Sequence, residues 1–345
     1  MSLRREIFEQ PQVLQALLET QWEAAAALVR QLQQYQIRYI FLAARGTSDH
    51  AGLYAKYLWG EANRLPIALA APSLFTLYDT PPRLDGALVV GISQSGQSPD
   101  IVSVLAEGRR QGCPTLAITN APASPLADAA EFVIDIQAGA EKAVAATKTY
   151  TAQLMAVAML SLCLNPDPDL RQALDRVPAW VRQMLDLDDE IARLAARYRF
   201  MDTCVVLGRG YNYATAFEWS LKLKELAYVL AEPYSSADFQ HGPIATVARG
   251  FPVMAVAPQG KVLANMLNLL HGLRVEQKAE LLLISDSLDV LELGRSRLQL
   301  PPGIPEALTP LVSIVPAQLF CYHLTREKGF DTERPRGLKK VTETE

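Results

Sequence analysis

The sequence has 345 residues, of which 50% are hydrophobic and 20% are charged, and its formal net charge is −4. This length and composition predict a soluble protein of two domains, each large enough to bury its own core. The weakly acidic balance excludes the basic surface that nucleic acid would need, and four scattered cysteines without a CxxC pair give no sign of a disulfide framework.

Secretion and membrane insertion are not expected either. The first residues, MSLRREIFEQP, lack the apolar segment of a signal peptide. The most apolar helix candidate, Ala152 to Leu164, is too short to cross a bilayer. We therefore expect a cytoplasmic protein with no membrane partner, no nucleic-acid partner, no metal and no cofactor.

Short apolar strands alternate with helices through the first half of the chain. The strands are predicted at Ile37–Ala43, Ile67–Ala71, Ala87–Ile92, Thr115–Thr119 and Phe132–Ile136, with helices near Asp49–Ala62 and Ser98–Gln111. Continuous apolar strands separated by helices indicate an α/β fold with a parallel sheet covered on both faces. The turn-forming segment NPDPD (165–169) is typical of a domain boundary, and a long helical stretch from Leu170 to Arg197 follows it.

The second half resembles the first as a weak internal repeat. Ile40–Tyr57 and Cys204–Leu221 share an apolar strand, an Arg-Gly turn and a helix, and CPTLAITN (113–120) matches AELLLISD (279–286). Between these anchors, GISQSGQS (91–98) corresponds to AVAPQGKV (255–262). The serine-rich loop is therefore present in one copy only, which is more typical of a site than of a scaffold.

Two turns of the first half, RGTS (45–48) and SQSGQS (93–98), are rich in glycine and hydroxyl groups. Each follows a strand, where open α/β sheets bind ligands, and each precedes a helix N-terminus that favours an anion. Neither turn has the Walker A or GxGxxG pattern of nucleotide-binding loops. Ser98 could instead simply cap the helix that begins at Pro99. The pair of turns favours a phosphomonoester held mainly by neutral donors.

Three charged residues of the second half, Glu218, Lys222 and Glu225, are spaced i, i+4 and i+7 along one face of a predicted helix. From spacing alone, a solvated stripe of charges is the usual meaning. His241, in DFQHGP, is by itself an incidental loop histidine, and the terminal RPRGLKKVTETE is typical of a disordered polar tail.

Together these motifs resemble the SIS (sugar isomerase) domain family, and more closely the isomerase half of glutamine–fructose-6-phosphate aminotransferase. The resemblance rests on EIFEQP (6–11), AEKAVAATKTYTAQL (140–154), EWSLKLKELAYVLAEPY (218–234), HGP (241–243) and RPRGLKK (334–340). It implies two tandem SIS domains, each a doubly wound parallel sheet flanked by helices. The implied division is an N-terminal helical segment (1–30), a phosphate-binding SIS domain (31–168), a catalytic SIS domain (169–328) and a tail over the active site (329–345).

The resemblance also assigns roles. It makes Glu225 the proton-transferring base, supported by Glu218 and Lys222. His241 would assist ring opening from the neighbouring subunit of a homodimer, and Lys340, or its neighbour Lys339, would form a Schiff base with the keto sugar. The implied phosphate ligands are Gly46, Thr47, Ser48, Ser93, Gln94, Ser95 and Ser98.

The sequence departs from the family pattern in two places. Ala146 stands where the synthases commonly have a serine, which implies altered sugar recognition, and ADFQ before His241 replaces their usual Gly-Glu-Leu-Lys. Because the isomerase segment begins almost at Met1, we expect no glutaminase domain.

The leading prediction is an amino-sugar-phosphate isomerase that converts glucosamine-6-phosphate to fructose-6-phosphate and ammonia. The alternatives are a deglycase for a fructosamine-6-phosphate, synthesis of glucosamine-6-phosphate with ammonia or a separate glutaminase, and a sugar-phosphate-binding sensor without activity. The sequence leaves the identity of the amino sugar open.

Overall fold

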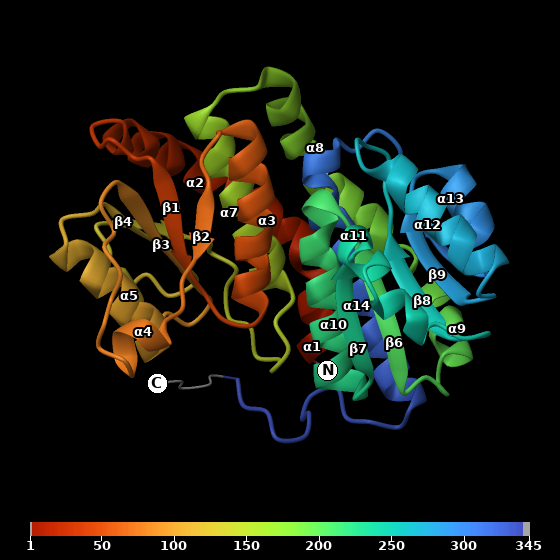
Figure 1. Cartoon of the computed structure of the whole chain (residues 1–345). Helices are drawn as coiled ribbons and strands as arrows, with labels where there is room; N and C mark the ends of the chain where they lie inside the picture. Colours follow the sequence, from red (N-terminus) through yellow and green to blue (C-terminus); the bar gives the residue numbers. More distant parts are fainter. Residues whose placement is uncertain (1, 341–345) are drawn as a thin grey trace. The chain divides into compact units, whose positions relative to one another are not determined.

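A computed structural model of the chain describes residues 2–340. Its contacts divide the chain into two compact units (Figure 1). Of the described residues, the first unit comprises 12–142, 146–175 and 339–340, and the second unit comprises 2–11, 143–145 and 176–338.

The first unit is built on a five-stranded parallel sheet with the order β2-β1-β3-β4-β5. Its strands are β1 (Tyr39–Ala43), β2 (Ile67–Leu69), β3 (Ala87–Ser93), β4 (Thr115–Thr119) and β5 (Phe132–Asp135). The chain order reverses between β1 and β3, and all of β1 pairs with Ala87–Gly91 of β3. Ligands bind at such a switch point, outside the carboxyl ends of the strands.

Helices cover this sheet. They are α2 (Gln10–Leu32), α3 (Thr47–Ala62), α4 (Ser73–Thr76), α5 (Pro99–Arg110), α6 (Pro125–Ala129) and α7 (Lys148–Leu164). Helix α7 packs against α3 and is buried along nearly its whole length, as its apolar residues on all sides predict. On another part of the sheet, Val89 of β3 packs with Val104 and Leu105 of α5 in a hydrophobic core.

The second unit repeats this arrangement. Its parallel sheet has the order β10-β9-β8-β6-β7, which is the same order of strands by position in the unit. The strands are β6 (Thr203–Gly208), β7 (Leu230–Ser235), β8 (Pro252–Val256), β9 (Glu280–Ser285) and β10 (Ser296–Gln299). The predicted fold of two doubly wound parallel sheets flanked by helices is confirmed.

The helices of the second unit include α14 (Thr309–Glu327), which is buried from Thr309 to Thr325. The others are α1 (Ser2–Phe8), α9 (Asp188–Arg197), α10 (Tyr213–Ala227), α11 (Ser236–Gln240), α12 (Leu263–Val275) and α13 (Leu288–Leu293), with short 3₁₀ turns η1 (Gly210–Asn212), η2 (Pro243–Thr246) and η3 (Glu306–Leu308). The segment Glu306–Glu327 is long and apolar enough to cross a bilayer, but 94% of its most apolar window is buried inside the protein, as in a core helix.

The long helical stretch predicted from Leu170 to Arg197 is wrong in one respect, because it is two helices. Helix α8 (Pro168–Leu185) ends before Asp188, where α9 begins. The Asp188 carboxylate accepts hydrogen bonds from Arg4 Nη2 at 2.6 Å and pairs with His323 Nε2 at 2.7 Å. Burial raises the pKa of Asp188, but the bonds to His323 and Arg4 lower it by more, so the net shift is downward. These long-range contacts fix the start of α9 and are not encoded in helical periodicity.

Candidate functional site

Two turns meet at the switch point of the first unit. The turn Arg45–Ser48 follows β1 and opens α3, and the turn Ser93–Ser98 follows β3 and opens α5. Arg45 Nε binds Asp100 Oδ2 at 2.8 Å, and the Asp100 side chain on the first turn of α5 is fully buried. This ion pair ties the two serine-bearing turns to each other. The arginine of the first turn is therefore already paired with a carboxylate of the protein.

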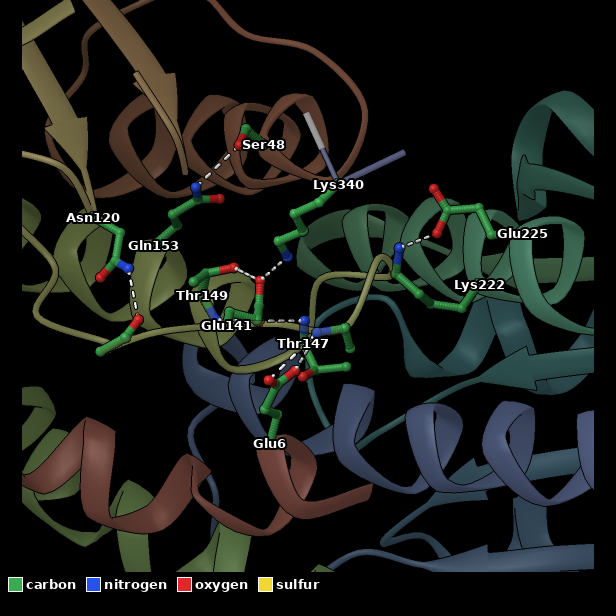
Figure 2. A network of polar contacts seen from close by, with 12 residues as sticks. Glu6, Ser48, Asn120, Glu141, Thr147, Thr149, Gln153, Lys222, Glu225 and Lys340 are labelled. Carbon is green, nitrogen blue, oxygen red and sulfur yellow. Dashed lines mark hydrogen bonds and ion pairs between the residues drawn. The ribbon is translucent and has the colours of Figure 1, made fainter. Parts of the chain in front are cut away.

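Three serine hydroxyls of these turns accept a hydrogen bond from a protein N–H group. Ser93 Oγ accepts from the Gly96 amide at 3.1 Å, and Ser95 Oγ accepts from the Gln97 amide at 3.3 Å. Ser48 Oγ accepts from the Gln153 side chain at 3.0 Å (Figure 2). A hydroxyl carries one proton and two lone pairs. Each of these serines can therefore still donate its own proton to an oxyanion.

Ser98 occupies the N-cap position of α5 with an extended backbone, φ −67° and ψ 112°. Its side chain makes no capping hydrogen bond, so capping explains the position of the residue but not the need for a hydroxyl. Gly46, the N-cap of α3, has φ 52°, and a Cβ placed there would meet nothing within 4 Å. Glycine is thus required by the left-handed backbone and not by crowding, and the space in front of this turn is open.

The remaining two expected phosphate ligands lie in the same turns. Thr47 is the first residue of α3 and is half-buried. Gln94 is half-buried as well, and its main-chain carbonyl accepts a hydrogen bond from the Asn120 amide at 3.3 Å. The structure therefore places the expected phosphate ligands at the carboxyl ends of the adjacent strands β1 and β3.

The turn of the second unit that corresponds to Ser93–Ser98, at 257–262, is filled by carboxylates of the chain itself. Glu306 Oε2 accepts from the Lys261 amide at 2.7 Å, and Asp286 Oδ1 accepts from the Gln259 amide at 2.7 Å. A Cβ added at Gly260 would fall 2.2 Å from Glu306 Cδ, so the carboxylate lies directly against this turn. Amide groups that a ligand would need are thus already bonded. This gives a physical reason why the serine loop occurs in only one copy.

The three charged residues of the second unit form a cluster on α10. Lys222 Nζ lies 2.5 Å from Glu225 Oε2 and 3.3 Å from Glu218 Oε1. The Glu218 side chain is fully buried and that of Lys222 is 2% exposed, whereas that of Glu225 is 23% exposed. The solvated stripe suggested by the spacing alone is therefore wrong. Glu225 is the one member of the cluster that reaches solvent.

Electrostatics keep Lys222 charged. Burial lowers its pKa, but the charges of Glu218 and Glu225 and their hydrogen bonds raise it by more, so the pKa lies above the usual lysine value. A lysine in this state is a permanent cation at neutral pH. It can form ion pairs with the neighbouring carboxylates but cannot act as a neutral amine nucleophile.

His241 directly follows the short helix α11, whose N-cap Ser235 accepts a hydrogen bond from the Asp238 amide at 3.1 Å. The histidine is exposed on the second unit and precedes Gly242, which has φ 136°. The structure thus holds His241 in a defined turn at the surface. It is not part of the cluster formed by Glu218, Lys222 and Glu225.

The C-terminal tail brings one lysine to a buried carboxylate of the first unit. Lys340 Nζ lies 2.8 Å from Glu141 Oε2, and the Glu141 side chain is fully buried (Figure 2). Glu141 also accepts from the amides of Thr147 and Thr149 at 2.9 and 3.2 Å, and from the Thr149 hydroxyl at 2.8 Å. Lys339 is exposed. The tail is therefore ordered at Lys340, contrary to what its composition alone suggests.

Sequence reasoning missed Glu141, Gln153 and the Arg45–Asp100 pair. Glu141 and Gln153 lie inside the motif AEKAVAATKTYTAQL, but neither was singled out. A signal was available for Gln153, because an amide in an otherwise apolar helix needs a partner. No comparable signal exists for Glu141, whose partner Lys340 is 199 positions away. Among residues 2–340, no group of three or more side chains has an arrangement that could hold a metal ion.

Comparison with known families supports the predicted relationship. The SIS domain family matches residues 35–162 and 201–327. The glutamine–fructose-6-phosphate aminotransferases (isomerizing) of Aquifex aeolicus and Methanothermobacter thermautotrophicus are 33% and 35% identical to this chain over 350 and 346 residues. Each alignment covers 99% of this chain and 57% of the relative, so the chain spans little more than half the length of these proteins.

Solved structures agree. A Silicibacter pomeroyi protein assigned as a phosphosugar isomerase is 34% identical with a TM-score of 0.86, over 96% of this chain and 99% of its own. The C-terminal domain of the Francisella tularensis glucosamine–fructose-6-phosphate aminotransferase is 30% identical with a TM-score of 0.87, over 97% and 98%. A Thermotoga maritima glucosamine-6-phosphate deaminase, at 18% identity and a TM-score of 0.80 with both chains fully covered, shares the fold. The prediction of an enzyme family is confirmed, and the chain belongs to the SIS domain family.

Proposed function

We propose that this protein is an amino-sugar-phosphate isomerase that converts glucosamine-6-phosphate to fructose-6-phosphate and ammonia. The observation that carries the proposal is the Glu218–Lys222–Glu225 cluster, with two members buried and the Glu225 carboxylate reaching solvent. Buried ion pairs contribute little net stability, because desolvation offsets their attraction. Such clusters are instead frequent where a carboxylate has to act on a substrate.

The phosphate end of the sugar binds at the two turns of the first unit. Its oxygens accept hydrogen bonds from the hydroxyls of Ser48, Ser93 and Ser95, which already have protein donors on their lone pairs. Gly46, Thr47, Gln94 and Ser98 complete this site. The N-termini of α3 and α5 favour the same negative charge. Neutral donors suit a phosphomonoester that has to be released after each turnover.

Proton transfer is the task of Glu225. After ring opening, its carboxylate takes the proton from C2 of the open-chain amino aldose and returns it to C1, while one proton of the C2 amine passes to the C1 oxygen. The products are a C1 alcohol and an imine at C2. Lys222 stays protonated beside it and stabilises the ionised carboxylate, while Glu218 compensates the buried cation. This division agrees with the raised pKa of Lys222, because its ammonium stays charged at neutral pH and can hold Glu225 in place by an ion pair.

Lys340 is the amine that we propose to attack the C2 imine. Ammonia leaves, and water then hydrolyses the new Schiff base to fructose-6-phosphate and free lysine. The contact with Glu141 supports Lys340 over Lys339, because a carboxylate beside the ammonium can accept the proton that the lysine must lose before attack. Lys339 is exposed.

His241 completes the proposed machinery as the group that assists ring opening. Its exposure within its own chain supports a role toward the sugar bound by a second copy, in a cytoplasmic homodimer. An imidazole is suited to proton transfer near neutral pH. The identity of curated relatives as isomerising aminotransferases supports the same class of substrate.

The test is a measurement of ammonia release from glucosamine-6-phosphate by the purified chain, with Glu225→Gln as the matched control. Fructosamine-6-phosphate, and fructose-6-phosphate with ammonium, are run beside it. The half-buried Ala146 favours including the fructosamine, because loss of a serine changes which hydroxyls of the sugar are recognised. Binding of glucosamine-6-phosphate without turnover would exclude it as the substrate, and turnover of the fructosamine alone would establish a deglycase.

A further inference from the structure

Gln153 is a polar residue inside the apolar helix α7. It is 1% exposed, and its Nε2 donates to Ser48 Oγ at 3.0 Å (Figure 2). Its Oε1 is buried and has no hydrogen-bond partner among the described residues. Burying an amide is unfavourable unless hydrogen bonds compensate it. The hydrogen bond of this side chain goes to Ser48 in the first turn of α3, so this contact is the clearest reason for a glutamine here.

The contact between α3 and α7 does not depend on Gln153. Further along the same helices, Trp59 Nε1 donates to the Val157 carbonyl at 3.0 Å and Asn63 Nδ2 donates to the Ser161 carbonyl at 2.9 Å. Ser161 Oγ also donates to Asn63 Oδ1 at 2.7 Å. Because 153, 157 and 161 are four residues apart, they share one face of α7. The two helices are therefore already fixed in register by the contacts of Trp59 with Val157 and of Asn63 with Ser161.

The direction of the Gln153–Ser48 bond has a consequence for the hydroxyl. A nitrogen donor occupies a lone pair of Ser48 Oγ, so the hydroxyl proton turns elsewhere. The hydroxyl groups of Ser93 and Ser95 are oriented in the same way by hydrogen bonds from the main-chain amides of Gly96 and Gln97. Ser48 lies at the N-terminus of α3, where its amide already bonds the Arg45 carbonyl, and it has no such loop amide. Gln153 supplies the equivalent donor from α7.

We propose that Gln153 is a positioning residue that orients the Ser48 hydroxyl as a donor to a phosphoryl oxygen of the substrate. The inference rests on the proposed function, since it concerns the same phosphate-binding turns. Gln153 need not touch the substrate itself. Its effect passes through the single proton of Ser48.

Two substitutions of nearly the same size separate orientation from packing. Gln153→Glu replaces the donor with an acceptor, so the Ser48 proton is drawn to residue 153 and a negative charge is placed beside the phosphate. Gln153→Leu removes the donor and leaves the hydroxyl free to rotate. We expect the Kd of inorganic phosphate, measured by calorimetry, to rise about tenfold or more in Gln153→Glu and by less in Gln153→Leu. KM for glucosamine-6-phosphate should rise in parallel, with kcat changed much less.

Ser161→Ala is the control, because it removes the partly buried bond between Ser161 and Asn63 from the same pair of helices, away from Ser48. Its phosphate Kd should equal that of the wild type. A double-mutant cycle adds the decisive readout: in a Ser48→Ala background, Gln153→Leu should weaken phosphate binding no further. The cycle does not require the Gln153→Glu chain to fold.

The outcomes separate the two proposals. Wild-type phosphate binding in Gln153→Glu, together with weak binding in Ser48→Ala, overturns the role of Gln153 and leaves the proposed site intact. Additive losses in the cycle overturn it too, since they mean that Gln153 does not act through Ser48. A wild-type chain that binds neither inorganic phosphate nor glucosamine-6-phosphate overturns the proposed function itself.

Discussion

Replacing Lys222 with methionine tests whether the charge cluster on α10 is as well shielded from solvent as the structure indicates. The ammonium lies 2.5 Å from Glu225 and 3.3 Å from Glu218, and the Glu218 side chain is 0% exposed. Methionine fills a similar volume, so the change removes the charge with little cavity. Removing one partner of a buried ion pair costs about 3–5 kcal/mol, because the other charge stays buried. This is a large part of the roughly 5–15 kcal/mol that stabilises a typical protein.

Urea unfolding at pH 7, followed by tryptophan fluorescence, measures the effect. Because the urea m-value of a small protein is about 1–3 kcal/mol/M, the midpoint of Lys222→Met should fall by at least about 1 M. The double variant Lys222→Met with Glu218→Gln should recover a large share of the loss, since it also neutralises the buried carboxylate. A decrease in the free energy of unfolding below about 1 kcal/mol, which is the range of exposed ion pairs, would refute the inference that the cluster is shielded from solvent.

Four further outcomes follow from the site. Glu225→Gln should lower kcat by about 10²–10⁴-fold while leaving the Kd of inorganic phosphate unchanged; equal loss of both would make the residue structural. Borohydride should trap a sugar adduct on wild type and Lys339→Arg but not on Lys340→Arg, and an adduct on Lys339 contradicts the assignment. Mixed chains of His241→Ala and Glu225→Gln should regain about a quarter of wild-type activity if the histidine acts across a homodimer, and none if it acts within its own chain. Asp188→Asn should destabilise the protein at pH 7 but not at low pH. Because the pKa of Asp188 is lower in the folded state, its ionised carboxylate stabilises the fold above the unfolded-state pKa, and this stabilisation is lost as the pH falls through the folded-state pKa. A difference in urea midpoint between variant and wild type that is the same at pH 7 and pH 3 would contradict the prediction.

The fold was largely predictable because its signals are local. Apolar strands and helix starts lie next to each other in the sequence, and Thr115–Thr119 was placed at its observed bounds. The serine turns were found for the same reason, since the residues after each strand of a parallel sheet gather at one edge. Periodicity also placed Glu218, Lys222 and Glu225 on one helical face.

Burial and pairing across long distances were not predictable in this way. The spacing of the α10 cluster is the same for a solvated stripe and a buried one, and only packing against the rest of the second unit decides between them. The helix break before Asp188 depends on Arg4 and His323, and the order of the tail depends on a lysine that meets Glu141 across 199 positions. Such contacts are set by tertiary structure and leave no periodic trace in the sequence.

The carboxylate of Glu306 at the second unit's turn has a consequence for heat resistance. A unit whose amides are bonded by its own side chains is complete without a ligand, whereas the turns of the first unit gain partners only when phosphate arrives. Ligand present at 100 times its Kd adds about 2.7 kcal/mol to the state that binds it. On the proposed function, a saturating sugar phosphate should therefore raise the melting temperature of the first unit. It should bind with a stoichiometry of one phosphate per chain. The thermal stability of the first unit would thus depend on metabolite concentration, whereas that of the second unit would not.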